Sequence, residues 1–252
     1  MSPSDSRTKS AGAASNSSHS SLRRGFKALG ALLADPDDLP QVFTLIEALS
    51  GGTLQRIARR FEASERGRRL LAARPDIVER LGDRAALACL PDGTLGRAYL
   101  DFVERENISA EGIRAAGDAG MRHASELPAP LDYVHARMRD THDLWHAAIG
   151  YHGDVLGEAA LLAFIVAQTR NPALMLLVGV GLLKTIGKPD ARATILDGWR
   201  RGQQAAWLPD QDWEDLLALP VDEVRRRLRL EAAPVYTPVR SAELKAAMAM
   251  GL

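Results

Sequence analysis

The sequence predicts an all-α fold: a single-domain multi-helix bundle with a metal site between two antiparallel helices. Three observations support this prediction. Apolar residues recur at mixed spacings of three and four along 129–149, which is the period of a helix. Proline and glycine divide the rest of the chain into segments of helical length, and no segment outside short loops alternates convincingly with the period of a strand. A chain of 252 residues can also bury a substantial core as one domain.

The chain is expected to consist of a tail, a helical body and a second tail. Residues 1–20 are rich in Ser, Ala and Gly and almost free of large apolar side chains, so we expect a disordered tail. Their low acidic content leaves an organelle transit peptide as an alternative. The helical domain covers 21–232, and 233–252 form a C-terminal tail. The predicted helices are 21–34, 40–49, 52–63, 65–73, 93–105, 110–117, 129–149, 154–169, 171–186, 190–206, 210–217 and 220–229.

The breaks between these helices fall at residues that commonly end them. Pro172 suits the first position of a helix and ends the one before it. The other breaks lie at Asp35-Pro36, Gly51-Gly52, Arg74-Pro75 and Leu127-Pro128.

Charge and cysteine content narrow the class of protein. The chain carries 32 Lys and Arg against 32 Asp and Glu, and this balance argues against a general nucleic-acid binder. Cys89 is the single cysteine, which excludes an intramolecular disulfide and fits a reducing compartment. We expect Cys89 to be a small buried residue rather than a nucleophile.

The most informative segment is His-Asp-Leu-Trp-His at 142–146, followed by Glu158. On a helix with about 100° per residue, His142 and His146 lie roughly 40° apart. Asp143 lies about 100° from His142 and about 60° from His146 on the same helix. Glu158 belongs to the next helix, beyond a turn at 150–153, and an antiparallel pair brings it back toward the histidines. Two imidazoles and two carboxylates can therefore border one cavity, as in the metal sites of helical bundles.

His142, Asp143, His146 and Glu158 are accordingly the candidate metal-ligating and catalytic residues. The set suits a divalent metal ion, zinc first, with iron, manganese or cobalt as alternatives. No cysteine takes part, so the set differs from a closed structural zinc site and leaves room for water or substrate. The alternative is a buried polar network in which carboxylates pair with the two histidines.

These residues also carry a family resemblance. They match the pattern H-D-x-x-H-x11-E without a gap, and in this signature the chain resembles the coenzyme Q (ubiquinone) biosynthesis protein family. His152 and Asp154 do not match residues of that family. Weaker similarities, covering roughly 60–232, lie at 68–71 with Arg74-Pro75, 90–99, 133–139, Gly157-Glu158, Trp199 with Gly202, Trp213-Glu214, and Val224-Arg225 with Leu228.

The resemblance implies a protein that binds a polyprenylated quinone precursor beside the metal. It also implies support for oxidative decarboxylation at ring carbon 1, where a hydroxyl replaces a carboxylate. An ionised ring carboxylate needs a counter-charge, and Arg139, about 60° from His142, is a better candidate than Arg137, at about 140°. Tyr133, from the same similar segment, completes the expected substrate-binding set.

The expected partners are other ubiquinone biosynthesis enzymes, a membrane surface and a second copy in a homodimer, with no nucleic acid. A bacterial chain would lie in the cytoplasm, peripheral on the inner membrane, and a eukaryotic one on the matrix side of the mitochondrial inner membrane. Two other functions stay open. One is a non-catalytic lipid-binding scaffold that organises a biosynthetic complex, and the other is a metal-assisted hydrolase with Glu158 or Asp143 as general base.

Two apolar runs and one basic helix bear on lipid contact. The runs 159–167 and 172–183 are each shorter than the roughly 20 residues of a spanning helix. We expect two core helices there, with a slot for an isoprenoid tail as the alternative. The basic amphipathic stretch 21–34 either packs on the body or touches a membrane.

Overall fold

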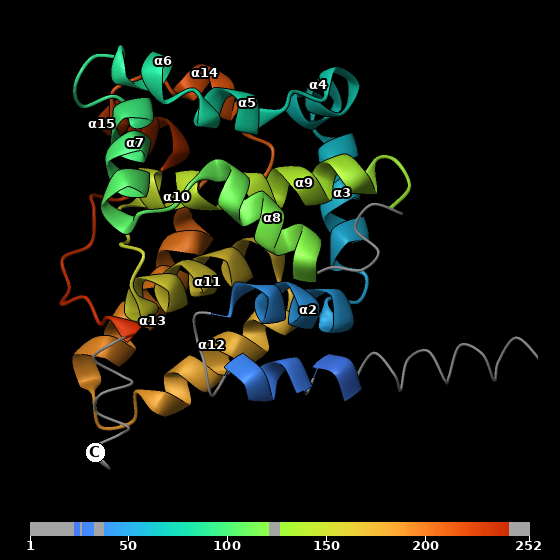
Figure 1. The fold of residues 1–252 in the computed structure, drawn as a ribbon, viewed down its shortest axis with the longest axis vertical. Coiled ribbons are helices and arrows are strands. Elements are labelled where there is room, and N and C mark those ends of the chain that lie inside the picture. The colour runs from blue at the N-terminus through green and yellow to red at the C-terminus, as the bar shows by residue number, and fades with distance from the viewer. Residues whose placement is uncertain (1–22, 26, 33–37, 121–126, 242–252) are drawn as a thin grey trace, which may run out of the picture.

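The computed structural model describes residues 23–25, 27–32, 38–120 and 127–241, and Figure 1 shows that they form an all-α fold. In this part of the chain no strand is present, and the β pairing there is one isolated bridge between Thr94 and Pro220. The all-α prediction is confirmed. The tail predicted at 1–20 lies outside the described residues, and of the helix predicted at 21–34 the residues 23–25 and 27–32 are helical.

The helices follow the predicted order closely. Their bounds are α2 Leu39–Leu49, α3 Thr53–Ala63, α4 Glu65–Ala73, α5 Ile77–Gly82, α6 Arg84–Ala88, α7 Leu95–Glu106, α8 Ala110–Gly120, α9 Leu131–Asp140, α10 His142–Ile149, α11 Val155–Thr169, α12 Pro172–Lys184, α13 Pro189–Gln204, α14 Trp213–Leu216 and α15 Val221–Leu228.

Two short helices, α5 and α6, were not predicted. Each begins at an aspartate whose side chain accepts a hydrogen bond from a backbone N–H in the first turn: Asp76 from Val78 N and Asp83 from Ala86 N. Such caps stabilise a helix end by about 1 kcal/mol. A helix of five or six residues is too short to show the apolar period on which the sequence prediction depended.

The single helix predicted over 129–149 is wrong at Thr141, where the structure has a turn between α9 and α10. Thr141 has a ψ of −1°, well away from the helical value of about −42°. Its hydroxyl donates to the carbonyl of Arg137 at 2.8 Å, a contact that bends helices. The histidines therefore occupy the first two turns of a helix of their own.

The helices pack in layers around one main core. In Figure 1, α9 and α10 cross the middle of the molecule, α11 and α13 lie below them, and α12 lies below these, near α2. Trp145 of α10 and Trp213 of α14 are fully buried, with ring centroids 6.5 Å apart. This contact joins the helix that carries the histidines to the upper layer of the bundle.

The pair α11 and α13 packs backbone against backbone. A Cβ atom on Gly198 would lie 2.1 Å from the carbonyl oxygen of Ala160, and one on Gly202 would lie 2.5 Å from that of Phe164. Only glycine permits such an approach. The contact holds α11, the helix that carries Glu158, against a long neighbour.

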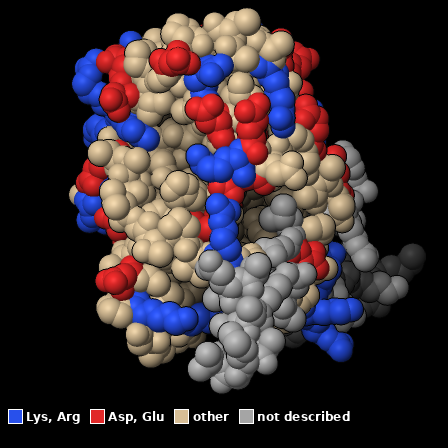
Figure 2. Space-filling model, turned by 60° about the vertical axis from the view of Figure 1, so that its left-hand side comes forward, with Lys and Arg blue, Asp and Glu red and all other residues tan. Residues whose placement is uncertain are grey.

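One surface expectation is corrected. Cys89, expected to be buried, is exposed. Residues 233–241, placed at the start of the predicted tail, hydrogen bond to the body through Tyr236 and Val239. Charged side chains of both signs are interspersed over the face shown in Figure 2. None of the described helices is both long enough and apolar enough to cross a membrane.

Candidate metal centre

The site lies where α10 is followed by α11. Gly150 ends α10 in the left-handed conformation, with a φ of 100°, and the chain then reverses. Asp154 begins α11, because its carboxylate accepts hydrogen bonds from the N–H groups of Leu156 and Gly157. Glu158 follows in the first turn of α11 and faces α10. The chain reversal between α10 and α11 places all three side chains of the site together.

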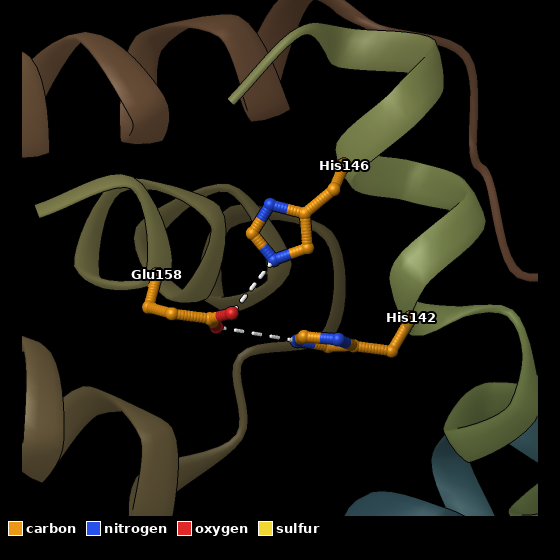
Figure 3. A group of neighbouring side chains, drawn as sticks. All are labelled: His142, His146 and Glu158. Carbon is orange, nitrogen blue, oxygen red and sulfur yellow. Dashed lines mark ion pairs between the residues drawn. The ribbon is translucent and has the colours of Figure 1, made fainter. Parts of the chain in front are cut away.

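His142, His146 and Glu158 converge on one point. Each offers a ligand atom, and these atoms lie within 4.8 Å of one another. Figure 3 shows both imidazole rings pointing from α10 toward the carboxylate on α11. The Nε2 atom of His146 lies 3.0 Å from Glu158 Oε1, and that of His142 lies 3.6 Å from Oε2. Two histidines and one carboxylate form an open ligand set for a divalent ion.

The other nitrogen of each ring has an oxygen acceptor. His146 Nδ1 lies 3.2 Å from the carbonyl oxygen of Tyr151, and His142 Nδ1 lies 3.1 Å from Asp143 Oδ1. A carbonyl oxygen can only accept, so His146 Nδ1 carries the proton. Nε2 is then left to face Glu158. Ligating histidines in metal sites are oriented by such contacts to their second nitrogen.

The charges in the site attract one another. Burial disfavours the charged form of Glu158, but attraction to His146 and His142 outweighs burial and lowers the pKa of Glu158 to about 2. Burial also works against a charged His142, while its hydrogen bond to Asp143 and its attraction to Glu158 raise the pKa of the imidazole. The carboxylate is therefore anionic at neutral pH and ready to bind a cation.

One ring nitrogen of the site bears directly on metal binding. His146 Nε2 is fully buried and makes no hydrogen bond, although Glu158 Oε1 is 3.0 Å away. A buried nitrogen without a partner is uncommon in native proteins. A cation bound beside the Glu158 carboxylate would complete its coordination, so the residues present fit a divalent metal.

The side chains of the site differ in their exposure to solvent: one side of the site is buried and the other is open. The His146 side chain is completely buried and stacks on Phe102 with ring centroids 5.0 Å apart, whereas the Glu158 side chain is 41 % exposed. The His142 side chain, at 21 %, is intermediate. The site is therefore open to solvent on the side of Glu158 and His142.

Asp143 and the substrate-binding candidates lie elsewhere. Asp143 contacts His142 Nδ1 and is not part of the converging group. Arg137 is buried and donates to both carboxylate oxygens of Glu214, at 2.8 and 2.9 Å, and to the hydroxyl of Tyr133. Arg139 donates to Asp118 and Asp140. The structure thus shows each of these two guanidinium groups engaged with carboxylates of the protein.

Two residues that hold the site were not predicted. Asp154 and Tyr236 hydrogen bond to each other at 2.7 Å, next to the start of α11. An Asp four residues before Glu158, at the predicted start of a helix, is a capping signal that could have been recognised. Tyr236 gave no signal, because it lies outside every predicted helix and 82 residues from its partner.

Comparison with known proteins shows the family to which the chain belongs. Residues 18–234 match the family described as Coenzyme Q (ubiquinone) biosynthesis protein Coq4. The chain belongs to the Coq4 family. Among its relatives is the mitochondrial ubiquinone biosynthesis protein coq4 of Schizosaccharomyces japonicus, 32 % identical over 73 % of this chain and 76 % of the relative. The mitochondrial COQ4 homolog of Danio rerio is 30 % identical over 86 % and 79 %.

A solved structure supports the fold. The crystal structure of a Nostoc punctiforme protein, provisionally assigned to ubiquinone biosynthesis, superimposes with a TM-score of 0.60 over 82 % of this chain and 97 % of that one. At 24 % identity this likeness concerns the fold alone. The expected family is confirmed, and this Coq4-family chain is a ubiquinone biosynthesis protein.

Proposed function

We propose that this Coq4-family protein binds the aromatic head of a polyprenylated ubiquinone precursor at a divalent metal and supports oxidative decarboxylation at ring carbon 1. One observation carries the proposal: ligand atoms of His142, His146 and Glu158 lie within 4.8 Å of one another. Zinc is the first candidate, and iron, manganese and cobalt suit the same ligand types.

The metal would be held by the Nε2 atoms of the two histidines and a carboxylate oxygen of Glu158. A bound divalent ion supplies Lewis-acid chemistry, polarising an oxygen atom of the aromatic head. The chain itself fixes the geometry. The Tyr151 carbonyl holds the proton on His146 Nδ1, Asp143 holds the His142 ring, and the exposed side of Glu158 leaves room for the ring to approach.

The overall reaction exchanges a ring carboxylate for a hydroxyl group. It releases CO2 and removes two electrons from the substrate, so an oxidant is required, and dioxygen is the one we propose. A hydrolase with Glu158 or Asp143 as base would work without dioxygen. Omission of dioxygen therefore distinguishes the two reactions.

A membrane surface is the proposed location, because the precursor carries a long apolar tail. Helix α12 is apolar along its length, yet only Ala173 and Leu174 in it are buried. In the last turn of α12 and in the turn that follows it, Leu183 and Ile186 are 67 % and 70 % exposed. An exposed apolar turn with lysines at 184 and 188 suits an anionic lipid surface. The relatives from Schizosaccharomyces japonicus and Danio rerio are named as mitochondrial proteins, and the membrane proposed here is an inner membrane.

A scaffold is the second candidate, and the arginines favour it. Arg137 and Arg139 were expected to hold the substrate carboxylate, but their donors face Glu214, Asp118 and Asp140. A protein that only holds and presents the lipid would not need a free guanidinium beside the ring. Partner enzymes would then perform the oxidation. A homodimer and the substrate roles of Arg139, Arg137 and Tyr133 stay predictions.

Turnover by the purified protein separates these functions. The chain is loaded with Zn²⁺, Fe²⁺, Mn²⁺ or Co²⁺ and mixed with a short-chain prenyl hydroxybenzoate in the presence and absence of dioxygen. Oxygen-dependent release of CO2 with formation of the hydroxylated ring supports the enzyme, provided that Glu158→Gln abolishes it. Substrate binding without turnover under every metal supports the scaffold.

A further inference from the structure

A segment near the C-terminus crosses the loop between α10 and α11. We call residues 235–240 the strap. In Figure 1 it descends in red from α15, at the left, to the start of α11. The Tyr236 hydroxyl donates to Asp154 Oδ2 at 2.7 Å, and Val239 N donates to Asp154 Oδ1 at 2.8 Å. The N–H of Val155 donates back to the Val239 carbonyl at 3.0 Å. The strap is thus hydrogen bonded to the loop along several residues.

Asp154 joins the strap to the metal ligand. Its side chain is buried, and its carboxylate accepts four hydrogen bonds: two from the N–H groups of Leu156 and Gly157 at the start of α11, and two from the strap. Its backbone carbonyl accepts the N–H of Glu158 at 2.8 Å. A buried carboxylate needs such donors, because an unpaired one carries a large desolvation cost. The strap therefore supplies two of the four hydrogen bonds to the Asp154 carboxylate, which begins the turn bearing Glu158.

Tyr236 contacts both sides of the site. Its hydroxyl accepts the N–H of His152 at 3.0 Å, and its ring lies edge-on to that of Tyr151, whose carbonyl orients His146. The hydroxyl also lies so close to Gly157 that a Cβ there would be 2.4 Å from it. The Tyr236 side chain thus contacts both Tyr151, whose carbonyl orients His146, and Gly157, which precedes Glu158.

We infer that Tyr236 and Asp154 are positioning residues that set Glu158 against His146 for metal binding. The inference rests on the proposed metal site and deepens it. The strap holds the first turn of α11 through its hydrogen bonds to Asp154, while the Tyr151 carbonyl orients the imidazole of His146. Without the Tyr236 hydroxyl, Asp154 loses one donor and His152 N loses its acceptor, so the carboxylate of Glu158 is no longer held at one distance from the imidazoles.

The test removes one oxygen atom. Tyr236→Phe and wild type are titrated with Zn²⁺ in competition with a chromogenic chelator, and the visible spectrum of the Co²⁺ form is recorded. Loss of a group that orients a ligand usually weakens metal binding 10–100-fold. We expect a weakening in this range for Tyr236→Phe, with an altered Co²⁺ spectrum. Arg240→Gln breaks the ion pair between the half-exposed Arg240 of the strap and the largely buried Glu106. It should weaken binding by a smaller factor and lower stability slightly.

Tyr133→Phe is the matched control. It deletes the same atom from a buried tyrosine whose hydroxyl contacts Arg137 and not the loop. It should lower stability without changing the Zn²⁺ affinity or the Co²⁺ spectrum. Wild-type affinity in both Tyr236→Phe and Arg240→Gln would overturn the inference and leave the proposed function intact. A wild-type protein that binds neither ion, or binds Zn²⁺ equally well after Glu158→Gln, would overturn both.

Discussion

The Nε2 atom of His146 lies 3.0 Å from Oε1 of Glu158, yet the two atoms make no hydrogen bond. The nitrogen is completely buried, while the carboxylate is partly open to solvent. A separation of 3.0 Å fits two ligands of one ion as well as it fits an ion pair, so an ion at this point is a proposal that metal analysis can test. Because the two residues come from different helices, the ion would also tie α10 to α11.

Metal content is the most direct check of this relationship. Protein purified without added metal should contain about one divalent ion per chain, and Glu158→Gln should lose it, because an amide is a poor ligand and carries no charge. Elemental analysis of both proteins measures the ratio. His152→Ala is the control, since His152 is outside the converging group and should keep the metal. Equal metal in wild type and Glu158→Gln would refute the site.

A second prediction concerns Arg137. Its side chain is 1 % exposed and pairs with both oxygens of Glu214, so Arg137→Met should lower the free energy of unfolding by about 3–5 kcal/mol. Much of that loss comes from leaving the Glu214 charge buried and unpaired. The double variant Arg137→Met with Glu214→Leu should lose less than the sum of the single variants. Urea denaturation measures all three. A substrate role predicts the reverse: an unchanged stability and weaker binding of the precursor.

The contact between α11 and α13 gives a third prediction. Gly198→Ala would place a Cβ atom 2.1 Å from a backbone oxygen that cannot move freely, and we expect a loss of about 1–3 kcal/mol. Gly179→Ala, in the interior of α12, meets nothing and should instead raise stability by about 0.5–1 kcal/mol, because alanine restricts the unfolded chain. Thermal unfolding of the two variants should shift in opposite directions. A shift of the same sign in both would contradict this description of the interface.

These cases show what the sequence could and could not predict. The spacing of His142, His146 and Glu158 located the site, because ligands one turn apart on one helix and early in the next need only local geometry to meet. Single-sequence periodicity likewise found the long helices. Periodicity did not predict the break at Thr141, because a threonine hydroxyl that hydrogen bonds to the previous turn leaves the spacing of the apolar residues unchanged.

Long-range partners could not be predicted in the same way. Arg137 was the weaker candidate for a substrate carboxylate, behind Arg139, and no pattern in the sequence indicated that its donors face Glu214, 77 residues away. Tyr236 reaches Asp154 across 82 residues from a segment without regular structure. In both cases a polar side chain finds its partner only through the tertiary fold, and no spacing rule connects the two positions.

The strap gives a prediction on pH. Burial works against the charged form of Glu106, but hydrogen bonds from Arg240 and Arg105 outweigh it and hold the pKa of the carboxyl below its usual value. A carboxyl with a lowered folded-state pKa adds stability above its unfolded pKa, about 4.3, and loses it as the pH falls through the folded value. Wild-type stability should therefore drop below about pH 4.3 more steeply than that of Glu106→Gln. Equal slopes in acid denaturation would show that this ion pair contributes nothing.

The exposed end of α12 and the turn that follows it give the last prediction. Leu183 and Ile186 are 67 % and 70 % exposed, and Lys184 and Lys188 beside them are exposed as well. Burying one such aliphatic side chain in a bilayer is worth roughly 1.5–3 kcal/mol, and each lysine near an anionic surface adds about 1 kcal/mol. Leu183→Glu should therefore weaken binding to phosphatidylglycerol vesicles, measured by sedimentation, at least tenfold.

The control variant is Ile108→Glu, at an exposed apolar residue between α7 and α8, which should leave vesicle binding unchanged. Binding should also fall with salt, because the lysine contribution is screened. If Leu183→Glu and Ile108→Glu bind vesicles equally well, this turn does not meet the membrane and α12 has another partner.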